Sequence, residues 1–277
     1  MRISAISYLN TAPLMWGFEH GLHPNFEISY TVPSQCAAEL AAGTADIGII
    51  PSAAYATIPN LAIIPGVAIA SKEAVRSILL VSHKPLEEIR TVALDSSSLT
   101  SAALTRVLFD RFWGGRRTFV SSAPDLDAML LTNDAALLIG DPALQVNRAR
   151  YRTWDLAEEW IRFTGKPFVF AFWAVRQDAV KDRSLNLAAI FQQSRDQGLA
   201  AANLDQITKT WSAKLGLSGG DVREYLTRNI HFELDPDCIE GLQLFYRYAH
   251  EGGLLPRVPE LRMVSSFAPS ELGHVSL

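Results

Sequence analysis

Short apolar runs alternate with helix-like runs along the first half of the chain. Residues 3–7 are typical of a strand, and Pro13 can begin the helix that follows, because the first helical turn does not need its missing N–H. Residues 27–32 alternate between apolar and polar side chains, as a half-buried second strand does. Residues 46–50 are apolar after Asp46 and predict a buried strand. This alternation predicts β-α units around a largely parallel sheet.

The helix expected between the second and third of these strands has candidate caps at both ends. Ser34 stands where an N-cap belongs, and Gly43 stands where a left-handed C-terminal residue belongs. The two residues predict a helix over 34–42.

A related pattern returns later in the chain. Residues 126–132 are helix-like, residues 135–139 predict a buried strand, and Gly140-Asp141-Pro142 can begin another helix. Two lobes built on one plan would produce this repetition. Because no Pro/Gly/Ser-rich linker lies between them, we expect the chain to cross between the lobes as extended strands.

The crossings are expected near residues 83–85, after a strand over 77–82, and near residues 170–175. Lobe one is therefore predicted to comprise residues 1–84 and 175–277, and lobe two to be inserted as residues 85–174. The segment 177–252 has helical periodicity and is expected to pack on lobe one, followed by a loop-like tail.

Composition excludes several classes of protein. A chain of 277 residues with 48% hydrophobic residues can form two compact lobes, and a net charge of −4 offers no basic surface for nucleic acid or anionic lipid. The most apolar stretch, 61–70, is interrupted by Pro65 and Gly66 and is far shorter than the roughly 20 residues that span a membrane. Cys36 and Cys238 lie far apart and predict two buried thiols. The first residues form a strand rather than a signal peptide, so we expect a cytoplasmic protein.

The loops that follow the strands are the candidate site, because open α/β sheets bind ligands beyond the carboxyl ends of their strands. Hydroxyl and amide groups dominate these loops, and such groups suit an anion held at helix N-termini. Helix capping alone would explain one or two of the hydroxyls. The run from Asp95 to Ser101 has more than a cap needs, which favours a ligand site. The four loops are 7–11, 51–52, 95–101 and 140–141.

Several well-known binding and catalytic motifs are missing from the sequence. There is no Gly-x-x-x-x-Gly-Lys-Ser/Thr loop, no Gly-x-Gly-x-x-Gly after a strand, no His-Glu-x-x-His and no Gly-x-Ser-x-Gly. The six histidines show no pair at the helical i, i+4 spacing. We therefore predict neither a cofactor nor a metal site.

Seven segments taken in order resemble the chorismate dehydratases of the futalosine route to menaquinone. The resemblance runs from about residue 2 to residue 176 and implies the type II periplasmic-binding-protein fold, with a ligand cleft between two lobes. It also implies chorismate as the small-molecule partner and loss of water as the reaction. The segments are SYLNTAPL at 7–14, DIGIIPS at 46–52, RSILLVS at 76–82, ALDSSSLTS at 93–101, LIGD at 138–141, DLAEEW at 155–160 and GKPFVFA at 165–171.

The resemblance carries candidate roles onto individual residues. It implies that Asn10 and Ser77 are catalytic and orient the reacting face, and that Ser97, Thr100 and Ser101 bind one substrate carboxylate. Further substrate-binding candidates in the same loops are Ser7, Ser52, Asp95, Ser96, Gly140 and Asp141.

Two points stay open at this stage. The base that removes the proton is either the substrate's own enolpyruvyl carboxylate or Asp95. Some relatives carry a carboxylate shortly after the Pro-Ser pair, where this chain has Ala53-Ala54-Tyr55, so an acid–base role there is in doubt.

Two other functions are compatible with such a fold. One is a non-catalytic cytoplasmic protein that binds a small carboxylate. The other is the sister dihydroxynaphthoate synthase, whose first motif is rich in Pro and Cys, unlike Ser7-Tyr8-Leu9-Asn10. The sequence does not set the oligomeric state.

Overall fold

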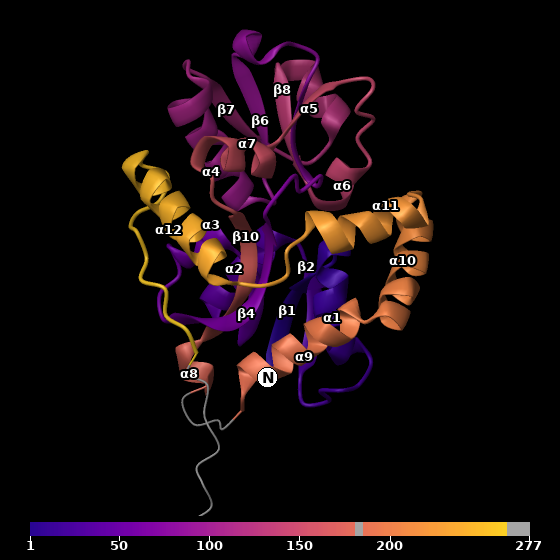
Figure 1. Ribbon diagram of the computed structural model, residues 1–277. Helices are drawn as coiled ribbons and strands as arrows, with labels where there is room; N and C mark the ends of the chain where they lie inside the picture. Colours follow the sequence, from indigo (N-terminus) through magenta and orange to yellow (C-terminus); the bar gives the residue numbers. More distant parts are fainter. Residues whose placement is uncertain (181–184, 265–277) are drawn as a thin grey trace, which may run out of the picture.

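The computed structural model of the chain describes residues 1–180 and 185–264. Two five-stranded sheets form two lobes, one above the other in Figure 1. The first sheet has the order β2-β1-β3-β10-β4 and the second the order β7-β6-β8-β5-β9. The strands of the first are β1 (Arg2–Ile6), β2 (Glu27–Thr31), β3 (Ile47–Pro51), β4 (Leu61–Ser71) and β10 (Phe168–Arg176). Those of the second are β5 (Ile78–Ser82), β6 (Thr91–Asp95), β7 (Thr118–Ser122), β8 (Ala135–Ile139) and β9 (Arg152–Asp155).

Both sheets follow one plan, as the repeated sequence pattern predicted. In each, the second strand in the order pairs in parallel with both of its neighbours: β1 with β2 and β3, and β6 with β7 and β8. The fourth strand of each sheet, β10 or β5, is antiparallel to both of its neighbours. The sheets are therefore mixed rather than largely parallel.

The two antiparallel strands also correct the predicted lobe boundaries. The strand β5 was predicted in lobe one but belongs to the second sheet, and β10 starts before the predicted boundary at 174 and belongs to the first. The chain thus leaves the first sheet after β4 and returns along β10, which Figure 1 shows running down from the upper lobe. Both strands are apolar and buried, so their sequences do not show to which sheet each strand belongs.

Helices cover the faces of both sheets. Lobe one carries α1 (Ala12–Glu19), α2 (Pro33–Ala42), α3 (Ser52–Tyr55), α8 (Gln177–Val180), α9 (Leu187–Leu199), α10 (Ala201–Leu215), α11 (Gly219–Glu224) and α12 (Pro236–Glu251). Lobe two carries α4 (Leu99–Leu108), α5 (Leu126–Thr132), α6 (Gly140–Leu144) and α7 (Leu156–Thr164). The helical segment predicted over 177–252 is confirmed. Its helix α9 packs on α1 and β4, whereas α12 contacts both β10 and α4 of lobe two. The predicted tail beyond residue 264 lies outside the described residues.

Local signals fix most helix ends. Pro13 lies in the first turn of α1, and Gly43 ends α2 with a φ of +75°, both as predicted. Ser34 is not the N-cap of α2: the helix starts one residue earlier, at Pro33, and Val32 precedes it in an extended conformation. The fixed φ of proline suits the first helical position, which explains the earlier start.

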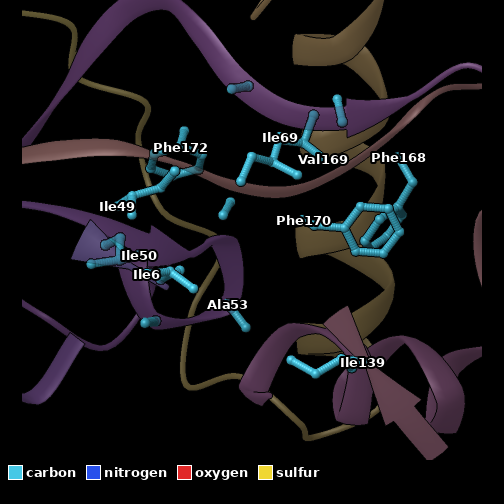
Figure 2. Packing of buried hydrophobic residues seen from close by; sticks show 14 of the residues in the cluster. Ile6, Ile49, Ile50, Ala53, Ile69, Ile139, Phe168, Val169, Phe170 and Phe172 are labelled. Carbon is cyan, nitrogen blue, oxygen red and sulfur yellow. The ribbon is translucent and has the colours of Figure 1, made fainter. Parts of the chain in front are cut away.

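The core extends across the contact between the lobes. Phe172 and Trp173 of β10 are completely buried in it. Figure 2 shows part of this packing, with Ile6 and Ile69 of the first sheet and Ile139 of the second in one cluster. The apolar contact therefore reaches the edge of the cleft.

Candidate functional site

A small cavity of about 50 Å³ lies between the lobes, where the predicted loops meet. Asn10 follows β1, Pro51 ends β3, Thr100 lies beyond β6 and Gly140 follows β8. All four loops predicted from the sequence thus contribute to one cavity. The remaining polar side chains of the lining are Tyr8, Ser98 and Ser101, and its apolar side chains include Ile6, Ile69, Ile78, Ile139 and Phe170.

The cavity is much smaller than a usual ligand site of about 300–1,000 Å³. About 50 Å³ is room for one or two water molecules. The lobes are therefore closed on each other, and an organic ligand can enter only when they separate.

The turn that carries Asn10 is held from the opposite lobe. Leu9 to Thr11 form a 3-10 turn, and the Leu9 N–H donates a hydrogen bond of 3.0 Å to Oδ1 of Asp141. Burial raises the pKa of Asp141, and the Leu9 N–H opposes that rise in part. Asp141 does not line the cavity, so the geometry gives it a role in fixing the turn.

The loop after β6 is fixed by its own aspartate. Asp95 Oδ1 accepts hydrogen bonds from the Ser97 N–H at 2.9 Å and from the Ser97 hydroxyl at 2.6 Å. Asp95 Oδ2 is buried and has no hydrogen-bond partner among the described residues. Burial raises the pKa of Asp95. The carboxylate is 2% exposed and lies outside the cavity lining, which suits a loop-fixing group better than a base in contact with substrate.

The first turn of α4 joins the two lobes. Thr100 Oγ1 accepts a hydrogen bond of 3.0 Å from the Ala53 N–H of lobe one and lies 3.3 Å from Ser52 Oγ. Ser52 also donates to the Val169 carbonyl at 2.8 Å and is completely buried. Ser98 caps α4 through a bond from the Ser101 N–H. Thr100 and Ser101 thus face the cavity, whereas Ser52 lies behind it.

Several of the predicted serines lie outside the cavity lining. Ser7 and Ser96 are exposed and do not line the cavity. Their backbone N–H groups donate instead to the carbonyls of Thr31 and Ser122. Ser97 is 7% exposed and directs its hydroxyl to Asp95, so it too is absent from the lining.

Ser77 lies beneath the cavity wall. Its hydroxyl accepts a hydrogen bond of 2.8 Å from the Tyr225 hydroxyl, and its carbonyl accepts one from the Gly140 N–H. Gly140 has a φ of +62°, and a Cβ at this position would lie 2.8 Å from ring carbons of Tyr8. Only glycine allows this close approach without strain.

Sequence reasoning missed three residues. Tyr8 and Ser98 line the cavity, and both stand inside loops that were singled out, so their position was the available signal. Tyr225 is 148 positions from Ser77, and no local pattern could have paired the two.

The electrostatics of the cavity favour an anion. Among the residues that the structure describes, no charged side chain belongs to the lining. Pro33 and Thr100, which do belong to it, lie at the N-termini of α2 and α4, each ten residues long. Free N–H groups and the helix dipoles give such termini a partial positive charge. The cleft can therefore hold a carboxylate by hydrogen bonds without a cation.

A larger hollow of about 600 Å³ lies on lobe one, away from these loops. It is bordered by the end of α2, residues 58–60 and Arg176–Asp178. The Arg176 guanidinium there pairs with the Asp178 carboxylate, which satisfies its charge within the chain. The smaller cavity between the lobes is the better candidate site, because the hydroxyl-rich loops and helix N-termini converge there.

One group of side chains within the described ranges could offer three atoms to a metal ion. It consists of His231, Asp235 and Cys238. The Lys72 ammonium lies 2.6 Å from Asp235 Oδ2, which His231 also contacts at 2.8 Å. Burial raises the pKa of the Cys238 thiol to about 12, which disfavours the thiolate that binds metals. The cluster is better explained as an ion pair and the N-cap of α12.

The fold is that of the periplasmic binding proteins. A protein from Archaeoglobus fulgidus superposes with a TM-score of 0.74 at 16% identity, covering 92% of this chain and 98% of that one. The alkanesulfonate-binding protein SsuA from Xanthomonas axonopodis superposes with a TM-score of 0.64 at 16% identity, covering 94% and 96%. These likenesses confirm the predicted two-lobed α/β architecture.

Sequence comparison places the chain more narrowly. The family described as menaquinone biosynthesis matches residues 1–251, and the chain belongs to it. A protein of Thermus thermophilus named chorismate dehydratase is 27% identical over 257 residues, which cover 86% of this chain and 91% of that protein. Among the described residues, no helix combines the length and apolar character that a membrane crossing requires.

Proposed function

We propose that the chain is a chorismate dehydratase, a hydro-lyase that converts chorismate to 3-[(1-carboxyvinyl)oxy]benzoate. The name of the Thermus thermophilus relative supports this assignment. The observation that carries it is the composition of the cavity, where Asn10, Thr100 and Ser101 meet at a helix N-terminus. Hydroxyl, amide and N–H groups suit the carboxylates of a dianionic substrate. A place in the cytoplasm stays a prediction.

One substrate carboxylate is proposed to bind at the start of α4. Thr100 and Ser101 face the cavity there, and the helix dipole adds to their hydrogen bonds. Ser97 is proposed to act indirectly, by fixing the loop before α4, because its hydroxyl is hydrogen-bonded to Asp95. This arrangement turns the ring of the substrate toward Asn10.

The reaction removes the ring proton at C3 and the hydroxyl at C4. The C3–H electrons form the new C3–C4 double bond, the C4–O bond breaks, and the proton and hydroxide leave together as water. Aromatisation drives this elimination. We propose that the enolpyruvyl carboxylate of the substrate takes the proton, since a carboxylate held at contact distance acts at an effective molarity on the order of 10⁵ M or more.

Asp95 is the rival base, and its surroundings favour the substrate-assisted route. Oδ1 is occupied by two donors from Ser97, and the side chain is 2% exposed. A base must come within hydrogen-bond reach of the proton that it removes. Asp95 would have to leave its loop to do so.

The proposal is tested by incubating the purified chain with chorismate, without added metal or nucleotide. Chromatography with mass detection should find a product lighter than chorismate by one water. A reaction without the protein controls for spontaneous decay of chorismate, and a mock purification controls for contaminating enzymes. Absence of the dehydrated product, or its formation at the same rate in either control, would reject the proposal.

The same experiment separates the other two functions. A carboxylate binder without turnover, which would share only the fold of the alkanesulfonate-binding protein, would retain chorismate unchanged. The sister dihydroxynaphthoate synthase would leave chorismate alone and instead convert a nucleoside-derived product of the same pathway. Each alternative therefore predicts no dehydrated product.

A further inference from the structure

A buried tyrosine reaches from the C-terminal helices to the floor of the cleft. Tyr225 begins a π-helical turn, Tyr225–Asn229, directly after α11, and its side chain is 2% exposed. Its hydroxyl donates to Ser77 Oγ at 2.8 Å. Single π-helical turns are rare in proteins, and those that occur are often found at functional sites. The contact ties a late segment of lobe one to the residue that precedes β5.

Ser77 stands directly behind the cavity wall. The next residue, Ile78, lines the cavity, as does Gly140, whose N–H donates to the Ser77 carbonyl at 2.8 Å. The Ser77 side chain is 0% exposed. The residues of the cavity wall thus fix the backbone of Ser77. The direction of its O–H bond remains to be determined by a hydrogen-bond partner.

The Tyr225 hydroxyl sets that rotation. A serine hydroxyl has one hydrogen and two lone pairs, and its hydrogen turns toward whichever acceptor is available. Tyr225 donates to one lone pair, so the Ser77 hydrogen must point away from the phenol. Within residues 1–180 and 185–264, Tyr225 is the only side chain that bonds to Ser77 Oγ. The serine hydrogen therefore has no acceptor among the described residues. Because Ser77 is 0% exposed and lies outside the cavity lining, a ligand can reach this hydrogen only when the lobes separate.

Burial keeps Tyr225 in its donor form. Complete burial raises the pKa of the phenol above its ordinary value of 10.0, and hydrogen bonding with Ser77 and Asn10 opposes the rise only in part. The phenol thus stays protonated at neutral pH.

We propose that Tyr225 is a positioning residue that orients the Ser77 hydroxyl toward the hydroxyl group that the substrate loses. This inference rests on the proposed dehydration. As the C4–O bond breaks, Ser77 donates a hydrogen bond to the departing oxygen and keeps its own proton. The hydroxide combines with the proton from C3, so that one water leaves. Without the phenol, the Ser77 hydrogen can turn away from the leaving group.

The test is a cycle of three variants: Tyr225→Phe, Ser77→Ala and the double substitution. Phenylalanine keeps the ring and removes only the hydroxyl. We expect Tyr225→Phe to lower kcat about tenfold, the value of one oriented hydrogen bond, with KM changed less than twofold. Because Tyr225 acts through Ser77, the double variant should be no slower than Ser77→Ala alone.

Tyr55→Phe is the matched control. Tyr55 is 4% exposed, and its hydroxyl contacts the carbonyls of Leu61 and Glu260 at 3.4 and 3.3 Å, outside the cleft. Its removal also deletes one buried phenol hydroxyl, but kcat should not change. All rates are measured below the melting temperature of the least stable variant.

The outcomes separate this inference from the proposed function. Product from the unaltered chain together with full kcat in Tyr225→Phe would overturn the positioning role alone. Independent losses that multiply in the double variant would do the same, because they would mean that Tyr225 does not act through Ser77. No dehydrated product from the unaltered chain would overturn both.

Discussion

Replacing Thr100 by valine tests whether its hydroxyl holds the lobes together. Valine keeps the shape of the side chain, which is 2% exposed, but cannot accept the 3.0 Å hydrogen bond from the Ala53 N–H. In the closed form that N–H would be buried without a partner, at a cost of about 1–3 kcal/mol. In the open form water can bond to it. The substitution therefore raises the free energy of the closed form relative to that of the open form.

A ligand that binds the closed form must supply this energy. We expect the apparent affinity for chorismate to fall about 5- to 150-fold in Thr100→Val, which corresponds to the same 1–3 kcal/mol. The substrate dependence of the initial rate measures this change. Small-angle scattering of the unliganded variant should also show a more extended particle than the unaltered chain.

Thr105→Val is the matched control on the same helix. The Thr105 hydroxyl donates to the Ser101 carbonyl at 2.8 Å, within lobe two, and the side chain is 0% exposed. This substitution should lower stability by about 1 kcal/mol and leave the affinity within twofold. Because Thr100 is also proposed to bind a substrate carboxylate, the scattering of the unliganded proteins decides between the two roles. A Thr100→Val profile equal to that of Thr105→Val would refute the role in closure.

Three further predictions concern the loops around the cavity. Asn10→Ala should lower kcat by about 10²-fold with the melting temperature nearly unchanged, because a displaced near-attack geometry can cost that much; a nearly normal rate would argue against the substrate-assisted route. Asp95→Asn should keep most of its turnover. Burial raises the pKa of Asp95, so its contribution to stability is present below the ordinary value of 3.8 and is lost as pH rises through the raised value. The melting temperature of Asp95→Asn should therefore rise relative to that of the unaltered chain as the pH increases from about 4. A difference in melting temperature that does not change with pH would contradict this. Gly140→Ala should destabilise the chain and weaken substrate binding, since it combines a φ of +62° with a Cβ 2.8 Å from the Tyr8 ring. Gly165→Ala, at a φ of +68° with open space around it, should show only the loss of stability.

Local sequence signals predicted the elements better than their placement. The helix over 126–132 and the strand over 135–139 have the predicted bounds, because a capping aspartate and an unbroken apolar run mark them. The boundaries at 84 and 174 assign β5 and most of β10 to the other sheet, although the return to lobe one near residues 170–175 was predicted. A buried strand is apolar in either sheet, and which neighbours it pairs with is decided by contacts far along the chain.

For the candidate site, too, some features were predictable from the sequence and others were not. The four loops were singled out because ligands bind beyond the carboxyl ends of strands, and all four contribute to the cavity. The roles within the loops were less predictable. Asp95, Ser97 and Asp141 point their polar atoms at the protein rather than into the cavity, since buried polar groups take the nearest partner. Such choices depend on distances that the sequence does not contain.

The hydrogen bonds across the cleft explain how closure and catalysis are connected. Three backbone N–H groups of lobe one, from Leu9, Ser34 and Ala53, donate to acceptors of lobe two at 3.0, 3.1 and 3.0 Å. The first of these fixes the turn that carries Asn10, and the third fixes the helix start that carries Thr100. When the lobes separate, both groups lose their anchors at once. The site is therefore complete only in the closed form, so a substrate that favours closure also orders the residues proposed to act on it.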